Sequence, residues 1–333
     1  MDTTMHRRTL GLAALAALAA IAALATTAAP RPARAETYPS RPIKVIVPFS
    51  AASATDTLAR EVGARLAEAW GQPVVVENRP GASGMLAAAA AAKAPADGYT
   101  LFFTSNTTQA ANPGLYVKLP YDPVKDFAPV APLAAAANLL VVSPALGPAT
   151  LAELLALAKA QPGKLSFAHG SSLSRMNGEM LRSMAGIHIV PVAYKSNPQG
   201  VTDLLGGHVQ LMFADTITAL PHVKAGKLRA LAIGSARRSA LLPDVPSVAE
   251  AGVPGYELTG WLAVFAPAGT PEPVLDRLHD EIARILALPA MRERLQQLGV
   301  DALPGSRAQL GELVRTEIPK WARLVKDAGI QPE

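Results

Sequence analysis

Residues 43–78 carry the order of elements that decides the fold: IKVIV, then PFSAASATDTLAREVGARLAEAW, then GQPVVVEN. The first and last of these segments are rich in β-branched residues, which is typical of buried strands. Between them Leu58, Val62 and Leu66 recur at helical spacing and predict a helix over 55–70. A strand, a helix and a strand in this order predict a parallel pair of strands joined by a right-handed crossover.

The same alternation continues through most of the chain. Further strands are predicted at 101–104, 139–142, 165–168, 189–192, 209–213, 228–233 and 261–266, and further helices at 81–93, 151–160, 176–185 and 202–205. A Pro-rich stretch from Pro113 to Pro132 separates the first three strands from the rest, and helical patterns dominate after Ala266. We therefore predict an α/β fold with two doubly wound lobes, a helical tail, and a ligand cleft at a hinge between the lobes.

The chain is expected to cross between the lobes near Ala137 and near Leu258, where one series of strands ends and another begins. The first lobe is then discontinuous, with residues 36–137 and 258–333, and the second lobe contains residues 138–257. Loops at the carboxyl ends of parallel strands face such a cleft, which is where open α/β sheets bind ligands.

The N-terminus has the pattern of an export signal. Arg7 and Arg8 precede an Ala/Leu-rich run over 10–25, and Ala33 and Ala35 supply the small residues of a cleavage site. We expect removal of residues 1–35 and a soluble periplasmic protein. The alternative, an uncleaved anchor, is less favoured because the run is shorter than the roughly 20 residues of a spanning helix. The arginine pair fits both general and twin-arginine export, and that choice stays open.

Composition excludes several classes of protein. Half of the 333 residues are hydrophobic and 17% are charged, which excludes a disordered chain. Without residues 1–35 the chain has 27 basic and 25 acidic residues, and a net charge of +2 gives no reason to expect a nucleic-acid partner. The chain has no cysteine, so it has neither a disulfide nor a lipid-anchored cysteine.

The sequence contains no motif of a known catalytic or cofactor site. Gly-x-Ser-x-Gly, the P-loop, Gly-x-Gly-x-x-Gly and His-Glu-x-x-His are absent, and the histidines lack the spacing of metal ligands. We expect no enzyme activity, no cofactor and no metal. A Ser-His-Asp site stays open as an alternative, because its members can lie far apart in sequence.

Polar loops follow three predicted strands and precede predicted helices, at 50–56, 104–108 and 170–175. Free backbone N–H groups at helix N-termini, together with hydroxyls, favour a bound anion. The alternative is that the hydroxyl residues only cap their helices. Asp56 and Asp215 are placed to accept hydrogen bonds from a ligand, although Asp56 fits equally well as an acidic residue in the first turn of a helix.

Several stretches of the sequence resemble the sequence motifs of a known family. They are YPSRPI (38–43), IVPF (46–49), VVENRPGA (75–82), ADGYTL (96–101), LPYDP (119–123), TDLLGG (202–207), AGKLRALA (225–232), LPDVPS (242–247) and APAGTP (266–271). With these stretches the chain resembles the tripartite tricarboxylate transporter substrate-binding proteins, also called the Bug family, from Tyr38 to Ile330.

The resemblance implies a type II periplasmic-binding-protein fold whose two lobes close on a small, carboxylate-type ligand. It also implies delivery of that ligand to a membrane transporter made of one large and one small integral subunit. A periplasmic sensor that feeds a signalling kinase is the alternative. We expect a monomer.

The same resemblance places the carboxylate in the polar loops and at one further position. The candidate ligand-binding residues are Ser50, Ala52, Ser53, Thr55, Asp56, Ser105, Asn106, Thr107, Ser171, Ser172, Arg175 and Asp215. Arg175 is expected just before a helix, where it grips a carboxylate or, alternatively, pairs with Glu179.

The chain departs from the family pattern in four places near the expected cleft. The first loop lacks the usual Pro and Gly, Met85 replaces an Asn, Ser196-Asn197 replaces Gly-Gly, and Arg175 replaces a His. These departures leave the identity of the ligand open.

Overall fold

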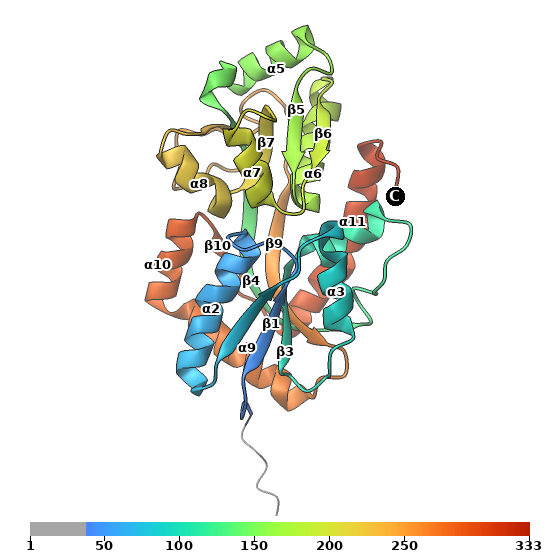
Figure 1. The fold of residues 1–333 in the computed structure, drawn as a ribbon, viewed down its shortest axis with the longest axis vertical. Coiled ribbons are helices and arrows are strands. Elements are labelled where there is room, and N and C mark those ends of the chain that lie inside the picture. Colours follow the sequence, from blue (N-terminus) through green and yellow to red (C-terminus); the bar gives the residue numbers. More distant parts are fainter. Residues whose placement is uncertain (1–37) are drawn as a thin grey trace, which may run out of the picture. The chain divides into compact units, whose positions relative to one another are not determined.

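The computed structural model of the protein describes residues 38–333, in which strands and helices alternate as predicted (Figure 1). The predicted signal segment and its cleavage site after Ala35 lie outside the described residues. Residues Arg41–Glu333 form one compact unit, and the following description concerns this unit.

The first three strands form a parallel group, with β1 (Ile43–Val47) between β2 (Val74–Asn78) and β3 (Thr100–Ser105). Helix α2 (Ala54–Trp70) connects β1 to β2 and buries the apolar stripe that the sequence predicts. Helix α3 (Met85–Ala92), preceded by a 3-10 turn at Ala82–Gly84, connects β2 to β3. The predicted strand–helix–strand order is confirmed.

A second parallel group has β5 (Ser166–His169) between β6 (Val190–Ala193) and β7 (Leu211–Asp215). The helices and remaining strand of this region are η3 (Pro144–Leu146), α5 (Leu151–Ala160), α6 (Ser172–Ala185), α7 (Asn197–Leu205), α8 (Thr216–Lys224) and β8 (Arg229–Ile233). Two of these helices start earlier than predicted. Because α6 begins at Ser172, Arg175 lies in its first turn and not before the helix, which corrects the prediction.

Two long antiparallel strands join the two groups. The sheet order is β2-β1-β3-β9-β4-β7-β5-β6, in which β4 comprises Phe127–Val142 and β9 comprises Thr259–Pro267. The prediction of a strand only at 139–142 was wrong, because β4 starts inside the Pro-rich stretch. Register shifts next to Pro129 and Pro132 accommodate residues that have no N–H to donate to the sheet.

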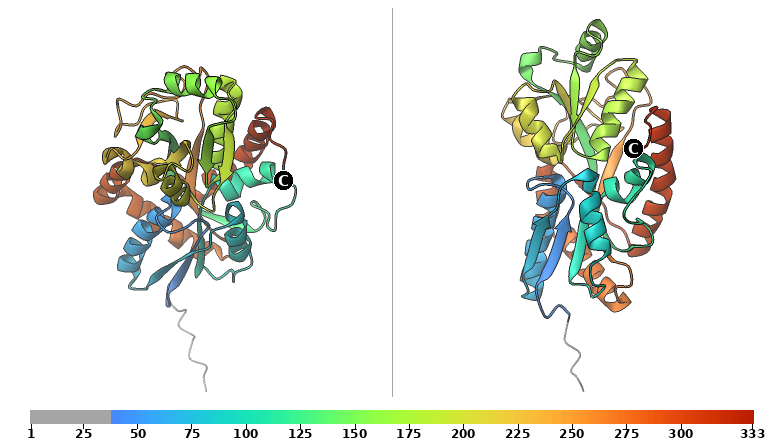
Figure 2. Two further views of the ribbon diagram at one scale, coloured as in Figure 1. Left: turned by 45° about the horizontal axis from the view of Figure 1, so that its top comes forward. Right: turned by 45° about the vertical axis from the view of Figure 1, so that its right-hand side comes forward.

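Strand β4 changes its partners between Ala137 and Asn138: up to Ala137 it pairs with β9, and from Asn138 it pairs with β7 and β8. Figure 2 shows β4 and β9 side by side between the two parallel groups. This arrangement agrees with the predicted two α/β lobes, which β4 and β9 connect. The predicted lobe boundaries, 36–137 with 258–333 and 138–257, stay a prediction; below, "first lobe" means 41–137 with 258–333 and "second lobe" means 138–257.

The remaining elements complete the first lobe. They are the π-helical turn η2 (Thr107–Ala111), α4 (Asn112–Leu115), α9 (Glu272–Ala287), α10 (Pro289–Leu298), β10 (Asp301–Ala302) and α11 (Arg307–Asp327). Trp321 of α11 is fully buried, and its indole N–H donates to Glu317 at 2.9 Å. Within 38–333, no helix has the length and apolar composition needed to cross a bilayer.

Candidate ligand-binding site

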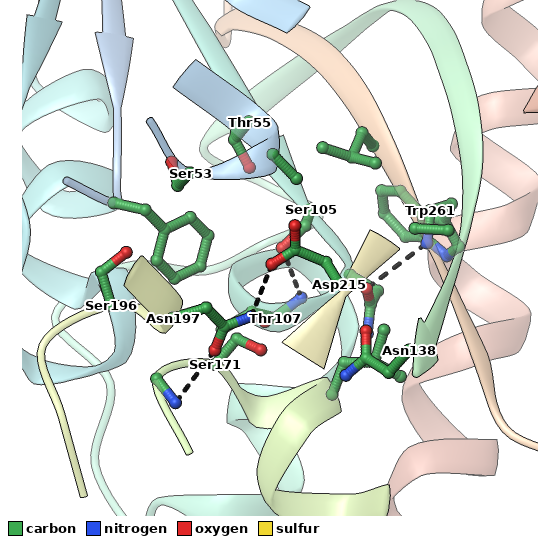
Figure 3. A pocket seen from close by; sticks show the side chains of 17 residues that line it. Ser53, Thr55, Ser105, Thr107, Asn138, Ser171, Ser196, Asn197, Asp215 and Trp261 are labelled. Carbon is green, nitrogen blue, oxygen red and sulfur yellow. Dashed lines mark hydrogen bonds between the residues drawn. The ribbon is translucent and has the colours of Figure 1, made fainter. Parts of the chain in front are cut away.

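A pocket lies where the carboxyl ends of β1, β3, β5, β6 and β7 meet (Figure 3). It encloses about 50 Å³, which at about 10–15 Å³ per water corresponds to a few water-sized groups. Its polar lining residues are Ser53, Thr55, Ser105, Asn106, Thr107, Asn138, Ser171, Ser196, Asn197 and Asp215. Phe49, Leu173, Trp261 and Leu262 are the larger apolar ones. Both lobes therefore contribute to one small pocket.

Four helices begin at this pocket. The N-cap residues are Ser53 for α2, Ser171 for α6, Ser196 for α7 and Asp215 for α8, and all four line the pocket. The side chains of Ser53, Ser171 and Asp215 accept hydrogen bonds from the first turns of their helices at 3.3, 3.2 and 2.9 Å. Because helix N-termini carry partial positive charge, the pocket favours an anion.

Five polar atoms of pocket-lining residues are buried and have no hydrogen-bond partner in the described part of the chain. They are Asn106 Nδ2, Thr107 Oγ1, Asn138 Oδ1, Ser196 Oγ and Trp261 Nε1. None of these residues is more than 5% exposed. Buried polar groups in folded proteins are nearly always paired, so this concentration of unpaired atoms in one place indicates a ligand-binding site.

The orientation of two side-chain amides follows from their backbone partners. Asn106 Oδ1 accepts from the backbone N–H of Trp261 at 3.4 Å, which leaves the Asn106 NH₂ group as the unpaired donor. Asn138 Nδ2 donates to the carbonyl of Phe213 at 3.1 Å, which leaves Asn138 Oδ1 as an unpaired acceptor. A backbone N–H only donates and a carbonyl only accepts, so neither amide is flipped.

Asp215 is the one ionisable residue among those that line the pocket in the described structure. Its Oδ1 accepts from the backbone N–H and the hydroxyl of Thr218 at 2.9 and 2.7 Å, and its Oδ2 accepts from Asn197 Nδ2 at 2.8 Å. Asn197 Oδ1 in turn accepts from the N–H of Gly170 at 3.1 Å. An anion in this pocket is therefore held by neutral donors and helix N-termini.

The structure brings most of the predicted site residues together. Those that line the pocket are Ser53, Thr55, Ser105, Asn106, Thr107, Ser171 and Asp215. Ser50, Ala52, Asp56, Ser172 and Arg175 are not among the lining residues.

Asp56 does not line the pocket but stabilises the loop at 50–56 through hydrogen bonds. It is 2% exposed, and it accepts hydrogen bonds from the N–H of Ala52, from Asn78 and from Arg60. Burial alone would raise the pKa of Asp56, but the hydrogen bonds from Arg60, Asn78 and Ala52 outweigh burial and lower the pKa. Ala52 has a φ of 64°, a left-handed conformation that its N–H bond to Asp56 stabilises.

Arg175 does not line the pocket and does not pair with Glu179. Its Nη1 lies 2.9 Å from the side chain of Glu333, and Glu179 pairs instead with Arg182 at 2.7 Å. The predicted Arg175–Glu179 pair was therefore wrong. Ser172 donates to Asn112 Oδ1 at 3.1 Å and so also contacts the first lobe rather than the pocket.

We expect Arg175→Ala to change ligand affinity by less than about threefold, because Arg175 does not line the pocket and its ion pair with Glu333 is partly exposed. Calorimetric titration of this variant beside Glu333→Ala checks the expectation, since both variants remove the same pair. If Arg175→Ala lowers ligand affinity more than tenfold and Glu333→Ala does not, the Arg175 guanidinium contributes to ligand binding.

The candidate ligand-binding residues did not include Asn138, Ser196, Asn197 and Trp261, although Ser196 and Asn197 were placed near the cleft. Ser196 and Asn197 follow β6 and begin a helix, so the strand–loop–helix pattern that selected the other loops also applied to them. Asn138 and Trp261 lie inside strands, where no loop pattern marks them.

His169 ends β5, directly before Gly170 of the pocket. Burial, aided by the positive charge of Arg175, lowers the pKa of His169 to about 4. Below pH 6.5 the unfolded chain binds a proton that the folded protein does not, so stability falls as the pH falls from 6.5 toward 4. We expect a loss of about 1–2 kcal/mol between pH 7 and pH 5. Urea unfolding at both pH values checks this loss, and an equal loss in His169→Gln would contradict the assignment to His169.

Comparisons with known proteins identify the family and confirm the predicted periplasmic-binding-protein fold. The profile of the tripartite tricarboxylate transporter family receptors matches residues 58–330. A UPF0065 protein of Bordetella bronchiseptica is 40% identical over 300 residues, which are 90% of this chain and 89% of that protein. The structure of an R. palustris protein with adipate has a TM-score of 0.87 and 36% identity, and covers 89% of this chain and 100% of that one. MatC from Rhodopseudomonas palustris with bound malate has a TM-score of 0.82 and 34% identity, and covers 86% of this chain and 100% of that one.

Proposed function

We propose that the chain, which belongs to the tripartite tricarboxylate transporter receptor family (also called the Bug family), captures a small carboxylate by lobe closure and delivers it to a transporter of the tripartite tricarboxylate type. Its relatives in sequence and structure are solute-binding proteins, so the chain is a solute-binding protein and not an enzyme. The two similar structures with adipate and malate support a carboxylate as the ligand.

The observation that carries this proposal is the set of unpaired, buried polar atoms in the pocket. The N–H donors of Asn106 and Trp261 suit the oxygens of a carboxylate, and the hydroxyls of Thr107 and Ser196 can donate as well. Each hydrogen bond to a charged acceptor contributes about 1.5–3 kcal/mol. A few such bonds, with four helix N-termini nearby, hold a carboxylate without a lysine or an arginine.

Direct contacts between the lobes support closure on the ligand. The hydroxyl of Thr216 donates to the carbonyl of Gly299 at 2.8 Å, and Ser172 donates to Asn112 at 3.1 Å. A ligand that touches both lobes binds the closed form better and increases its population. Small-angle scattering is expected to give a smaller radius of gyration at ligand saturation, and an unchanged radius would argue against closure.

Export and delivery are the parts of the proposal that concern the cell. We propose that the signal is removed after Ala35, so that the periplasmic protein starts at Glu36. Its intact mass tests this start site, and Met1 retained on a membrane-bound form would contradict it. Cross-linking in membranes tests delivery: we expect the large and small transporter subunits as partners, and capture of a sensor kinase instead would support the sensory alternative.

The binding function is tested by native mass spectrometry of protein freshly purified from the periplasm. We expect a complex heavier than the chain by the mass of one small organic acid, and loss of this mass after unfolding and refolding. Calorimetric titration with a panel of mono- and dicarboxylates of three to six carbons then gives the affinity. The proposal fails if no acid co-purifies and no member of the panel binds.

A further inference from the structure

Asn138 and Asp215 form a pair of hydrogen-bond acceptors within the pocket. They are directly opposite each other on the antiparallel strands β4 and β7. Residues opposite each other on neighbouring strands project to the same face of a sheet, and both residues line the pocket. In Figure 3 the Asp215 carboxylate lies in the middle of the labelled polar side chains, with Asn138 below it. Their oxygens are therefore available to the same ligand.

The acceptors of this pair are only partly used by the protein. Asn138 is 1% exposed, and its Oδ1 has no donor in the described structure. Asp215 Oδ2 accepts one hydrogen bond, from Asn197, and a carboxylate oxygen has room for a second. The bond of Asn138 Nδ2 to Phe213 fixes the orientation of the amide, so Oδ1 is the side-chain atom left without a partner.

A simple carboxylate does not match this pair. Its oxygens only accept hydrogen bonds, so they would lie against a second acceptor at Asn138 Oδ1 and against the negative charge of Asp215. The unpaired N–H donors belong instead to Asn106 and Trp261 of the first lobe. The pocket thus has a donor pair from the first lobe and an acceptor pair from the second lobe.

We infer that the solute is a carboxylate that also carries a hydrogen-bond donor, either a hydroxyl or an ammonium group, next to its carboxylate. This inference rests on the proposed function. The carboxylate binds Asn106 and Trp261, and the donor binds Asn138 Oδ1 and Asp215. Asn138 is then a residue that determines specificity, since it distinguishes a substituted acid from the plain one.

The test compares acids that share a carbon skeleton and differ in one group. The probes are propionate, lactate and alanine, then succinate, malate and aspartate, then glutarate, 2-hydroxyglutarate and glutamate, titrated into the wild-type protein by calorimetry. In at least one series we expect the hydroxy or the amino acid to bind at least about tenfold more tightly than the plain acid. Preference for the amino acid identifies an ammonium group, and preference for the hydroxy acid identifies a hydroxyl.

Two variants assign the preference to the acceptor pair. In Asn138→Leu we expect the preference to fall to within about twofold, because the acceptor is gone. In Asn106→Leu we expect plain and substituted acids to weaken by the same factor, so that the preference remains. Thermal melting checks that each variant is folded. The comparison of plain and substituted acids in the wild-type protein tests the inference even if a variant does not fold.

The outcomes separate this inference from the proposed function. If carboxylates bind but plain and substituted acids bind equally, or if Asn138→Leu keeps the full preference, the inference is wrong and the proposed function stands. If no acid of any series binds and no acid co-purifies with the protein, both are wrong.

Discussion

The double variant Asn106→Leu/Trp261→Phe is expected to bind the carboxylate at least a hundredfold more weakly than the wild type. The two changes remove both unpaired N–H donors of the first lobe; Leu is close to Asn in size, whereas Phe is smaller than Trp. Two hydrogen bonds to a charged acceptor are worth about 3–6 kcal/mol together, and about 2.7 kcal/mol already corresponds to a hundredfold change in affinity. Calorimetric titration measures the loss.

The same variant is expected to lose less stability when empty than Trp321→Phe, although Asn106→Leu removes the 3.4 Å acceptor of the Trp261 backbone N–H and Trp261→Phe leaves a smaller side chain. Burying a polar atom without a partner is unfavourable, so replacing it by an apolar group removes a cost. The matched control is Trp321→Phe, since the Trp321 indole is buried outside the pocket and is paired with Glu317. We expect the control to lose stability and to keep its affinity. A double variant with normal affinity, or one that is strongly destabilised, would show that the two donors serve the fold.

Gly170→Ala is expected to destabilise the protein by about 3 kcal/mol or more and to abolish measurable binding. A Cβ at Gly170 would lie 2.1 Å from the carbonyl carbon of Ser196 and 2.3 Å from the nitrogen of Asn197. Both are backbone atoms, so no rotation of a side chain relieves the clash. The loops after β5 and β6 have to separate, which breaks the bond from Gly170 N–H to Asn197 and frees Asp215 from Asn197.

Urea unfolding and calorimetric titration of Gly170→Ala measure these two effects. The matched control is Gly311→Ala in α11, where a Cβ meets Pro129 at 3.4 Å, an ordinary contact distance. In the interior of a helix alanine is favoured over glycine by up to about 1 kcal/mol, so we expect this control to be neutral or slightly stabilised. Wild-type stability in Gly170→Ala would mean that the close approach of the two loops is not required.

The parts of the fold that local sequence determines were predicted well. The strand at Ile43–Val47 and the helix that follows it have simple periodicities, and the structure places both where the sequence indicates. Strand β4 was largely missed because proline argues against a strand, whereas Pro129 and Pro132 lie beside register shifts that tolerate it. Long-range pairing with β9, which no local pattern reveals, stabilises this strand.

The pocket was predictable as far as it consists of loops at strand ends. Ser53, Ser105 and Ser171 follow from that rule. Asn138 does not, because it becomes a pocket residue only when β4 pairs with β7. The position of Arg175 was misjudged for a related reason: its partner Glu333 is far away in sequence, and only the folded chain brings the two side chains together.

The most direct test of the proposed function is a crystal structure of the protein with its co-purified acid or with the tightest-binding acid of the panel. We expect the acid between the two lobes, with its carboxylate oxygens within hydrogen-bond distance of Asn106 Nδ2 and Trp261 Nε1. An acid bound elsewhere on the molecule, with both of these N–H groups still unpaired, would contradict the proposal.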